Sequence, residues 1–453
     1  MPFKIFPLVQ EEPGPPPDGG VQAWLQILAS HLINALSWGY SASFGVYQLH
    51  YTTTLSLPES QVAWIGSLQV FLTFFLGTFA GRAADAGYAQ HAAVAGCSLI
   101  VLGTFMTSLA TEYWQIFLAQ GLCTGLGMGA CYVPSMAVVG SYWNKRKAFA
   151  IGLAASGSGT GSILFSLVIQ HLQATIGFPG AVRVQGYIAL AFAVVVILVF
   201  RPRLPPRKAG PLVEWKAFTE PTYVLFTIGV VLIFTAVYFC FFFINTYATL
   251  RVGLSAVEAA NLLVIISAIG IPVRPILGFL ADRYFGSLLT LIVSTIFLAI
   301  MLFVWIAVRS VSSLYVYSVF YGVATGAVQG SQYMSLLFTF TFGVSYLFVS
   351  GLASLTADLS KLGVRFGMVD SLIAFASLAG PPLAGALIQS DDGGFLKAQI
   401  WAGVVTMCAS LFICAAKWTE VKFDGPRSKA GEGETTPNNL EAVQVEDDGR
   451  AKA

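Results

Sequence analysis

Charge is scarce in this sequence. Of its 453 residues, only 10% are Asp, Glu, Lys or Arg, while 56% are hydrophobic. A soluble globular protein carries about 25% charged residues, because most of its surface faces water. Lipid must therefore be the solvent for most of this chain. The composition argues against a soluble enzyme, a nucleic-acid-binding protein and a disulfide-rich secreted domain.

The residues that build metal and catalytic centres are few and scattered. All six cysteines lie inside apolar runs, and none belongs to a CxxC pair or a His/Cys cluster. We therefore expect neither a metal site nor a disulfide framework. The sequence also shows no nucleophile–base pair and no phosphate-binding loop. We expect no cofactor and no enzymatic activity.

What the sequence has in abundance is long apolar runs. A membrane-spanning helix needs about 20 such residues, and twelve runs are long enough, six on each side of a basic, proline-rich stretch. They lie near residues 24–47, 62–80, 92–110, 114–134, 148–170, 184–200, 223–245, 257–280, 288–308, 312–330, 366–388 and 398–416. The sequence predicts an all-α integral membrane protein with twelve transmembrane helices in two halves, 23–200 and 223–416.

The segments outside these runs are polar. Residues 1–22 are acidic and proline-rich, and residues 417–453 are charged with few aromatics, so we expect both to be disordered. We expect no signal peptide in residues 1–22. Residues 201–222 form a basic linker between the halves. Lys and Arg concentrate in loops on the same side as this linker, which by the positive-inside rule predicts a cytoplasmic linker and cytoplasmic termini.

One stretch does not fit the scheme of twelve spans. Residues 331–350 are uncharged and rich in phenylalanine, and they could span a membrane by themselves. A thirteenth span would move Lys361 and Arg365 to the wrong side. A re-entrant or surface-lying segment would keep the topology. A retained intron is the third explanation, because the run Phe338–Phe342 is what a thymine-rich tract would encode.

A short pattern is repeated in the two halves. Gly81 and Asp85 follow the second span of the first half in the spacing Gly-x-x-x-Asp. Gly278 and Asp282, followed by Arg283, occupy the corresponding place in the second half. Duplicated six-helix halves are typical of secondary carriers, which hold their substrate near the midplane between the halves.

This repeated loop resembles the signature of the major facilitator superfamily, in which such loops latch one conformation. Two further motifs resemble the monocarboxylate porters of that superfamily, in their fungal branch. The matching residues are Asp18, Gly19, Gly20 and Trp24 before span one, and Tyr142, Lys145, Arg146, Gly152 and Gly157 around the start of span five. The resemblance covers roughly residues 15–420 and implies the major facilitator fold.

Glycines and basic residues of the second motif also have a direct physical interpretation. Lys145 and Arg146 anchor their loop in the cytoplasm. Gly152, Gly157 and Gly161 leave one side of span five nearly bare, so that another helix can pack against its backbone. We expect packing, rather than contact with substrate, to be the role of these glycines.

Arg274 is the most informative charged residue. It lies eight positions before Asp282, about 12 Å deeper along the helix. An arginine at this depth is costly and normally faces a cavity and a partner. The resemblance implies that it binds a substrate carboxylate, for which the guanidinium fork is well suited; a structural ion pair or a snorkelling side chain is the alternative. The family's animal members carry an acid where Gly270 stands here and a lysine in span one, so proton coupling through that set of charges is not predicted.

Polar side chains recur at helical spacing in spans one and ten. The side chains that we expect to contact substrate are Asn34, Ser41, Tyr317 and Tyr321. His31 and Asp370 are the candidate proton carriers. The alternatives are a hydrogen-bonded structural histidine and a solvated carboxylate near the interface. The phenylalanine-rich run of span seven is expected to face lipid or to pack.

These observations predict a secondary active transporter that moves a small organic acid or carboxylated metabolite by alternating access, as an efflux carrier. Proton-linked uptake of a monocarboxylate or vitamin is one alternative, and a transport-inactive sensor or receptor on the same fold is another. The expected partners are the small-molecule substrate, protons and the lipid bilayer, with no nucleic acid. The expected location is the plasma membrane.

Overall fold

The computed structural model describes residues 14–143, 147–206, 213–280, 284, 287–333, 362–419 and 422. Every regular element in these residues is helical. The helices before the linker are α1 (Gly20–Asn34), α2 (Tyr40–Ala42), α3 (Phe44–Thr54), α4 (Glu59–Ala83), α5 (Ala89–Thr107), α6 (Tyr113–Ile116), α7 (Thr124–Tyr142), α8 (Lys147–Ala155) and α9 (Gly157–Val199). Those after it are α10 (Pro221–Ala236), α11 (Tyr238–Tyr247), α12 (Ala256–Leu280), α13 (Ser287–Val304), α14 (Val311–Tyr333), α16 (Leu362–Gln389) and α17 (Leu396–Thr419).

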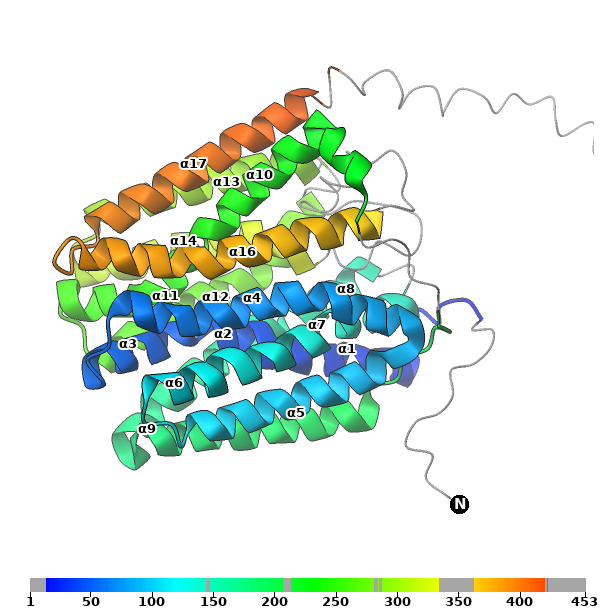
Figure 1. Ribbon diagram of the computed structural model, residues 1–453, viewed down its shortest axis with the longest axis horizontal. Coiled ribbons are helices and arrows are strands. Elements are labelled where there is room, and N and C mark those ends of the chain that lie inside the picture. The colour runs from blue at the N-terminus through cyan, green and yellow to red at the C-terminus, as the bar shows by residue number, and fades with distance from the viewer. Residues whose placement is uncertain are drawn as a thin grey trace, which may run out of the picture.

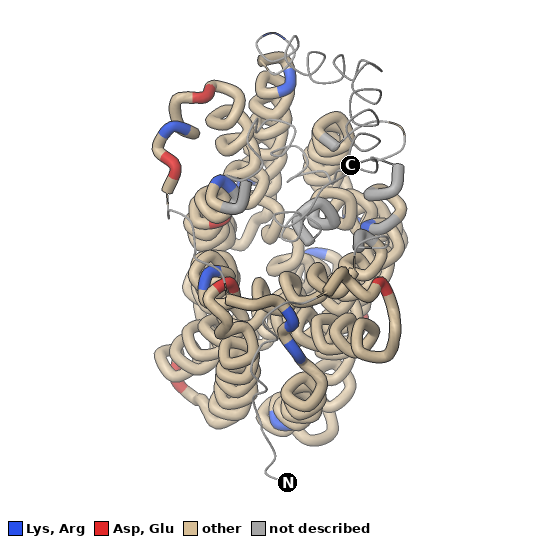
Figure 2. Tube along the Cα trace, turned by 90° about the vertical axis from the view of Figure 1, so that its right-hand side faces the viewer, with Lys and Arg blue, Asp and Glu red and all other residues tan. Residues whose placement is uncertain are grey.

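The long helices run side by side along one direction (Figure 1), with the first half, in blue to teal, below the second half, in green to orange. The linker lies at one end of the bundle, which we call the linker face. The short connections near residues 251–255, 308–310 and 390–395 lie at the opposite end, which we call the distal face. Figure 2 views the bundle end-on from the linker face and shows how sparse charged positions are along the helices.

Nine helical segments of the described residues are long and apolar enough to cross a membrane. Two of them, Glu59–Thr107 and Phe149–Val199, are 49 and 51 residues long, about twice what a bilayer needs. Each contains a glycine at positive φ, Gly87 at 92° and Gly177 at 73°. Glycine adopts this left-handed region readily because it has no Cβ. Both glycines mark places where the chain turns back.

Contacts across these glycines confirm the turns. The Gln185 side chain donates a hydrogen bond to the Phe165 carbonyl at 3.0 Å, whereas a straight helix would hold residues 20 positions apart at about 30 Å. Gly77 of α4 and Gly96 of α5 both lie against α7. Each long segment therefore makes two passes. The less apolar run from α1 to α3 is not among the nine segments; if it crosses as well, the arrangement agrees with the twelve spans that the sequence predicts.

Several predicted features lie outside the described residues. They are Lys145, Arg146, Asp282, Arg283 and the phenylalanine-rich stretch after Tyr333. The helices on either side of that stretch are described. α14 begins at the distal face and α16 begins at the linker face, where Arg365 contacts the linker residue Glu214. The end of α14 and the start of α16 thus lie at the same face.

Candidate functional site

A cavity lies at the centre of the bundle, where the two halves meet. The residues that line it are Trp38, Ser41, Ala42, Ser158 and Gly159 of the first half, and Tyr238, Phe241, Ile266, Ser267, Gly270, Arg274 and Thr325 of the second. Its volume is about 20 Å³, room for about one water molecule. This conformation is therefore closed around the cavity, and an organic substrate can enter only when the helices move apart.

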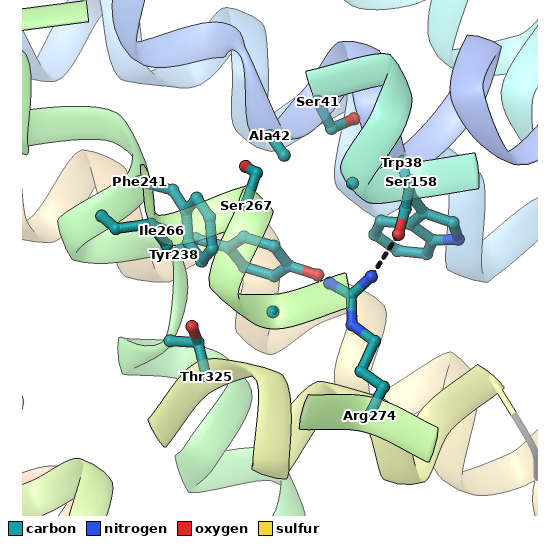
Figure 3. A pocket seen from close by; sticks show the side chains of 12 residues that line it. Trp38, Ser41, Ala42, Ser158, Tyr238, Phe241, Ile266, Ser267, Arg274 and Thr325 are labelled. Atoms are coloured by element: carbon teal, nitrogen blue, oxygen red, sulfur yellow. Dashed lines mark hydrogen bonds between the residues drawn. The ribbon is translucent and has the colours of Figure 1, made fainter. Parts of the chain in front are cut away.

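Arg274 supplies the positive charge of this cavity. Figure 3 shows its guanidinium reaching across from α12 toward Ser158 of α9, to whose Oγ the Nη1 group donates a hydrogen bond of 2.6 Å. The bond joins the two halves at the centre of the molecule. Gly270 lies one turn earlier on α12, and a Cβ built there would be 3.9 Å from the nearest guanidinium nitrogen. The missing side chain leaves space beside the charged group.

The remaining lining combines hydroxyl groups with aromatic rings. Ser267 of α12 donates to Ser162 of α9 at 2.8 Å, which is a second hydrogen bond between the halves. Thr325 donates to the Tyr321 carbonyl at 2.9 Å. In Figure 3 the Tyr238 ring has its hydroxyl end toward the guanidinium, and the Phe241 ring lies beyond it, on the side away from Arg274. One guanidinium among hydroxyls and rings suits a ligand with an acid group, hydrogen-bonding groups and an apolar body.

The structure brings together only some of the side chains that the sequence predicts to contact substrate. Arg274 and Ser41 line the cavity. Asn34 is buried outside it, where its amide donates to the Ser30 carbonyl at 2.8 Å. Tyr317 and Tyr321 also lie behind the lining.

The hydroxyl groups of these two tyrosines point to α11 and to the junction between α10 and α11. Tyr317 donates to the Cys240 sulfur at 3.9 Å and Tyr321 to the Val237 carbonyl at 3.3 Å. Their rings stack on each other at 5.5 Å, and Tyr317 stacks on Trp305 at 5.7 Å. Both tyrosines therefore belong to the aromatic interior of the second half.

The sequence prediction missed Ser158, Ser267, Tyr238 and Phe241 as cavity residues. Ser158 stands within the glycine-rich motif that was interpreted as packing, and Phe241 stands within the phenylalanine-rich run. All five residues of the run Phe239–Phe243 are buried. That run packs between the halves rather than facing lipid. A small polar residue next to a glycine in a membrane helix is the signal that could have identified Ser158.

His31 lies in α1 next to α9. Its Nδ1 atom is 3.0 Å from the Leu153 carbonyl oxygen, and its Nε2 atom is 2.9 Å from the Thr160 hydroxyl. A carbonyl can only accept, so Nδ1 donates. The Thr160 hydroxyl can donate to Nε2, or accept from it while donating to the Gly157 carbonyl at 3.1 Å. The neutral ring and the charged ring can therefore both keep two hydrogen bonds.

Asp370 lies in α16 and is only 6% exposed. A solvated carboxylate near the interface is the alternative for this residue, and the burial of the side chain contradicts it. Within the described part of the chain, the carboxyl group has no hydrogen bond or ion pair with another side chain. Buried carboxyl groups in membrane helices are typical of proton-binding sites.

The two motifs that resemble those of the monocarboxylate porters meet at the linker face. The Asp18 N–H donates to the Tyr142 carbonyl at 3.1 Å, and the Trp24 ring packs edge-on against Trp143 at 5.4 Å. Gly19 and Gly20 have φ angles of 158° and 79° at the start of α1. Gly20 is thus in the left-handed region, which glycine tolerates best.

The beginning of the linker docks beside these motifs. Arg203 donates to the Ser141 carbonyl at 2.8 Å, and the Tyr142 hydroxyl donates to the Arg201 carbonyl at 2.9 Å. Residues 202–205 and the loop that contains Asp85 line a shared surface hollow. Gly81 packs its backbone near the Val133 side chain. The first copy of the repeated loop therefore lies directly under the linker.

The end of the linker docks on the second half through Arg365. This arginine is 4% exposed and donates to Glu214 at 2.9 Å and to Glu220 at 2.5 and 2.6 Å. The Glu220 carboxylate, followed by that of Glu214, raises the pKa of the guanidinium above its usual value. The Tyr223 hydroxyl donates to the Arg365 carbonyl at 3.2 Å. Two carboxylates of the linker thus hold the first turn of α16.

The described residues contain no group of three His, Cys, Asp or Glu side chains that could hold a metal ion.

The family model described as Major Facilitator Superfamily matches residues 27–343 of this chain. An MFS-type transporter of Gibberella zeae is 39% identical over 416 residues, which cover 91% of this chain and 90% of that protein. The Aspyridones efflux protein apdF of Emericella nidulans is 31% identical over 424 residues, which cover 93% of this chain and 83% of that protein.

A solved structure has the same fold. It is a bacterial homologue of the human lysosomal transporter Spinster, in an inward-facing and unoccupied conformation. The TM-score is 0.66, with coverage of 89% of this chain and 98% of that one. The sequences are 17% identical, so this similarity supports the fold alone.

Proposed function

The chain belongs to the Major Facilitator Superfamily and is a multi-pass membrane transporter, and on that premise we propose that it exports a carboxylated secondary metabolite. Arg274, at the centre between the halves, is the observation that carries the proposal. Export is favoured over uptake because a relative with 31% identity is named as an efflux protein. The motifs at Asp18–Trp24 and Tyr142–Gly157 support membership of the fungal monocarboxylate-porter branch.

The proposed mechanism is alternating access. The halves 23–200 and 223–416 rock against each other, and the loops at Gly81–Asp85 and Gly278–Arg283 latch one conformation. In the closed form, Ser158 accepts a hydrogen bond from Arg274. A substrate carboxylate competes with this hydroxyl for the guanidinium, because a bidentate ionic hydrogen bond is stronger than one to a neutral oxygen. Substrate binding then loosens a tie between the halves.

The proposed setting is the plasma membrane, with the linker face in the cytoplasm. This orientation places the basic residues of the linker and of the loop before α8 on the cytoplasmic side. The orientation can be tested with two epitope tags, one after residue 453 and one in the distal loop near Asp392. Antibodies are then applied to intact cells. Labelling of the distal tag alone supports the orientation.

The cargo and its export can be tested together in a deletion strain. Mass spectrometry of culture medium and cell extract should show a carboxylated compound that remains in the deletion cells. Complementation by the unaltered chain should return it to the medium, whereas Arg274→Ala should export it at least tenfold more slowly because the ionic hydrogen bonds are lost. Arg274→Lys should restore little, since an ammonium group cannot reproduce the fork.

Arg183→Gln is the matched control, because it removes an exposed arginine far from the cavity. Equal membrane abundance of all variants must be verified. Normal export by Arg274→Ala would refute the role of Arg274. A deletion strain with unchanged metabolites in cells and medium would refute export itself.

Energy coupling is proposed to use protons carried by Asp370 or His31. Asp370 is buried without a described partner, and the hydrogen bonds of His31 suit both protonation states. We expect Asp370→Asn or His31→Gln to uncouple export from the pH gradient in reconstituted vesicles. An unchanged pH dependence in the double variant would point to another group or to facilitated diffusion.

A further inference from the structure

A second, larger cavity opens at the distal face of the second half. It has a volume of about 370 Å³, within the range of small-molecule sites in proteins. It shares no lining residue with the central cavity. The ends of α11 and α13 and the start of α17 surround it. We call it the distal cavity.

The polar groups of the distal cavity are mostly hydrogen-bond donors. Arg251 and Arg309 line it. Arg251 uses one guanidinium nitrogen to bond the Gly393 carbonyl at 2.8 Å. Arg309 has no hydrogen bond or ion pair within the described residues. The lining carboxylate, Asp391, is paired with Lys397 at 3.3 Å, so the charge that remains is positive.

A buried amide gives an independent sign of a ligand. Gln399 lines the distal cavity and is only 3% exposed. Its Nε2 group has no hydrogen-bond partner in the part of the chain that the structure describes. Buried N–H groups without an acceptor are rare, because they have lost water and gained nothing in return. A half-turn of the terminal amide, which exchanges its nitrogen and oxygen, would present this donor to an acceptor in the cavity.

The other walls of the distal cavity are apolar. The rings of Tyr247 and Phe395 meet edge-to-face at 5.1 Å, and Ile306 adds an aliphatic wall. The Tyr247 hydroxyl donates to the Val308 carbonyl, which holds the connection that carries Arg309. The first turn of α17 also contributes to the wall, and its free N–H groups favour negative charge.

We propose that the distal cavity binds an amphipathic organic anion, with Arg309, Arg251 and Gln399 donating to its acid group. Guanidinium and amide donors together select acceptor-rich carboxylate or phosphate groups, and the aromatic walls take an apolar body. An anionic lipid and a soluble organic acid share this chemistry. The proposal goes beyond export and does not depend on its direction.

The test uses the full-length protein in phosphatidylcholine nanodiscs and measures its thermal unfolding. One arm titrates decanoate, and the other includes phosphatidic acid in the nanodisc. We expect at least one anion to raise the unfolding temperature, since a ligand that binds the folded state stabilises it. Arg309→Gln and Gln399→Leu should each weaken the apparent affinity about tenfold or more. Arg183→Gln, an exposed arginine of the first half, should not.

The arms also identify the source and location of the anion. A response to decanoate alone indicates a soluble acid, a response to phosphatidic acid alone indicates a lipid, and a response to both indicates a site for the shared chemistry. Arg274→Ala should leave the response intact, so failure of the proposed export site would not affect this result. No response to either anion, equal losses in Arg309→Gln and Arg183→Gln, or loss only in Arg274→Ala would overturn the proposal.

Discussion

In each half, a glycine of a later helix packs directly against the backbone of an earlier helix. We call these two contacts the first seam, between α1 and α9, and the second seam, between α10 and α16. In the first half, a Cβ built on Gly157 of α9 would lie 2.0 Å from the His31 carbonyl oxygen of α1. In the second half, a Cβ on Gly380 of α16 would lie 1.9 Å from the Thr235 carbonyl oxygen of α10. Just after the contact, α1 passes into a π-helical turn at Ala35–Gly39, and α10 ends at Ala236. The two halves thus repeat one close helix contact.

One turn further on, the seams differ. Gly161 continues the first seam, with its Cβ position 2.5 Å from the Ala35 carbonyl oxygen. The corresponding residue of the second seam is Ala384, which is fully buried. The first seam therefore needs glycine over two turns and the second over one. The repeated fold requires the shared contact, while the rest of each seam is free to adapt to its own half.

The largest effect is expected from breaking the shared contact. Gly157→Ala and Gly380→Ala each place a methyl group against a carbonyl that cannot move without its helix. Overpacking of this kind costs about 3 kcal/mol, so the yield of folded protein should fall sharply in both, measured by size-exclusion chromatography of the solubilised transporter. Gly270→Ala is the control, because its Cβ would have 3.9 Å of clearance. A normal yield for either seam variant would show that the contact is not required in that half.

A smaller effect is expected where α16 is fastened at the linker face. Arg365→Gln leaves the Glu214 and Glu220 carboxylates without their cation. Breaking a fully buried ion pair costs about 3–5 kcal/mol, but Glu220 is partly exposed, and we expect about 2 kcal/mol of lost stability. Chemical or thermal unfolding of the purified protein measures it. The triple variant with Glu214→Gln and Glu220→Gln should recover part of the loss, and no recovery would contradict the ionic explanation.

The difference between the seams predicts unequal results for a reciprocal exchange. Gly161→Ala should lose about 1–2 kcal/mol by overpacking. Ala384→Gly should lose about 1–2 kcal/mol, through lower helix propensity and the loss of a buried methyl group, with no change in the contact between α10 and α16. The efficiency of crosslinking between cysteines introduced into α10 and α16 measures their contact. Stabilisation by Gly161→Ala would show that the first seam is not limited by glycine.

The smallest effect is expected in the aromatic interior of the second half. Tyr317→Phe removes a hydroxyl whose partner is the weakly accepting sulfur of Cys240. The loss should be about 0.5–1 kcal/mol, and export should continue at a rate near that of the unaltered protein. Abolished export with normal folding would restore the substrate contact that the sequence predicts for this tyrosine.

The sequence predicts the passes well because lipid imposes a strict rule on length and polarity. Most run boundaries agree with the helices within a few residues. The first and fourth passes continue further, to Thr54 and Tyr142, and the turn at Gly177 lies seven residues from the predicted ends on either side of it. The substrate-facing side chains are harder to predict. A helix in a bundle has one face toward the cavity and another toward its own half, and both are polar enough to carry tyrosine. Depth along the helix matters too, because Tyr321 and Thr325 are four residues apart and share a face, yet only Thr325 reaches the cavity.

Arg274 and Ser158 show what sequence can and cannot predict about the cavity. A charge inside an apolar helix has few acceptable surroundings, so Arg274 could be assigned to a cavity from sequence alone. Ser158 lies between two glycines, and a small residue there fits packing as well as hydrogen bonding. Its role depends on the position of Arg274, which is 116 residues away in the chain. Periodicity within one helix carries no information about that distance.

The two docked ends of the linker set a mechanical limit. Pro206 lies against Gly87 in the first half, and Glu214 is fastened to Arg365 in the second. Glu214 follows Pro206 by eight residues, and a fully extended chain spans at most about 3.6 Å per residue. While both ends stay docked, the anchor points cannot separate by more than roughly 29 Å. The linker therefore acts as a tether of fixed maximum length, and shortening it should restrict the amplitude of opening at that face before it affects folding.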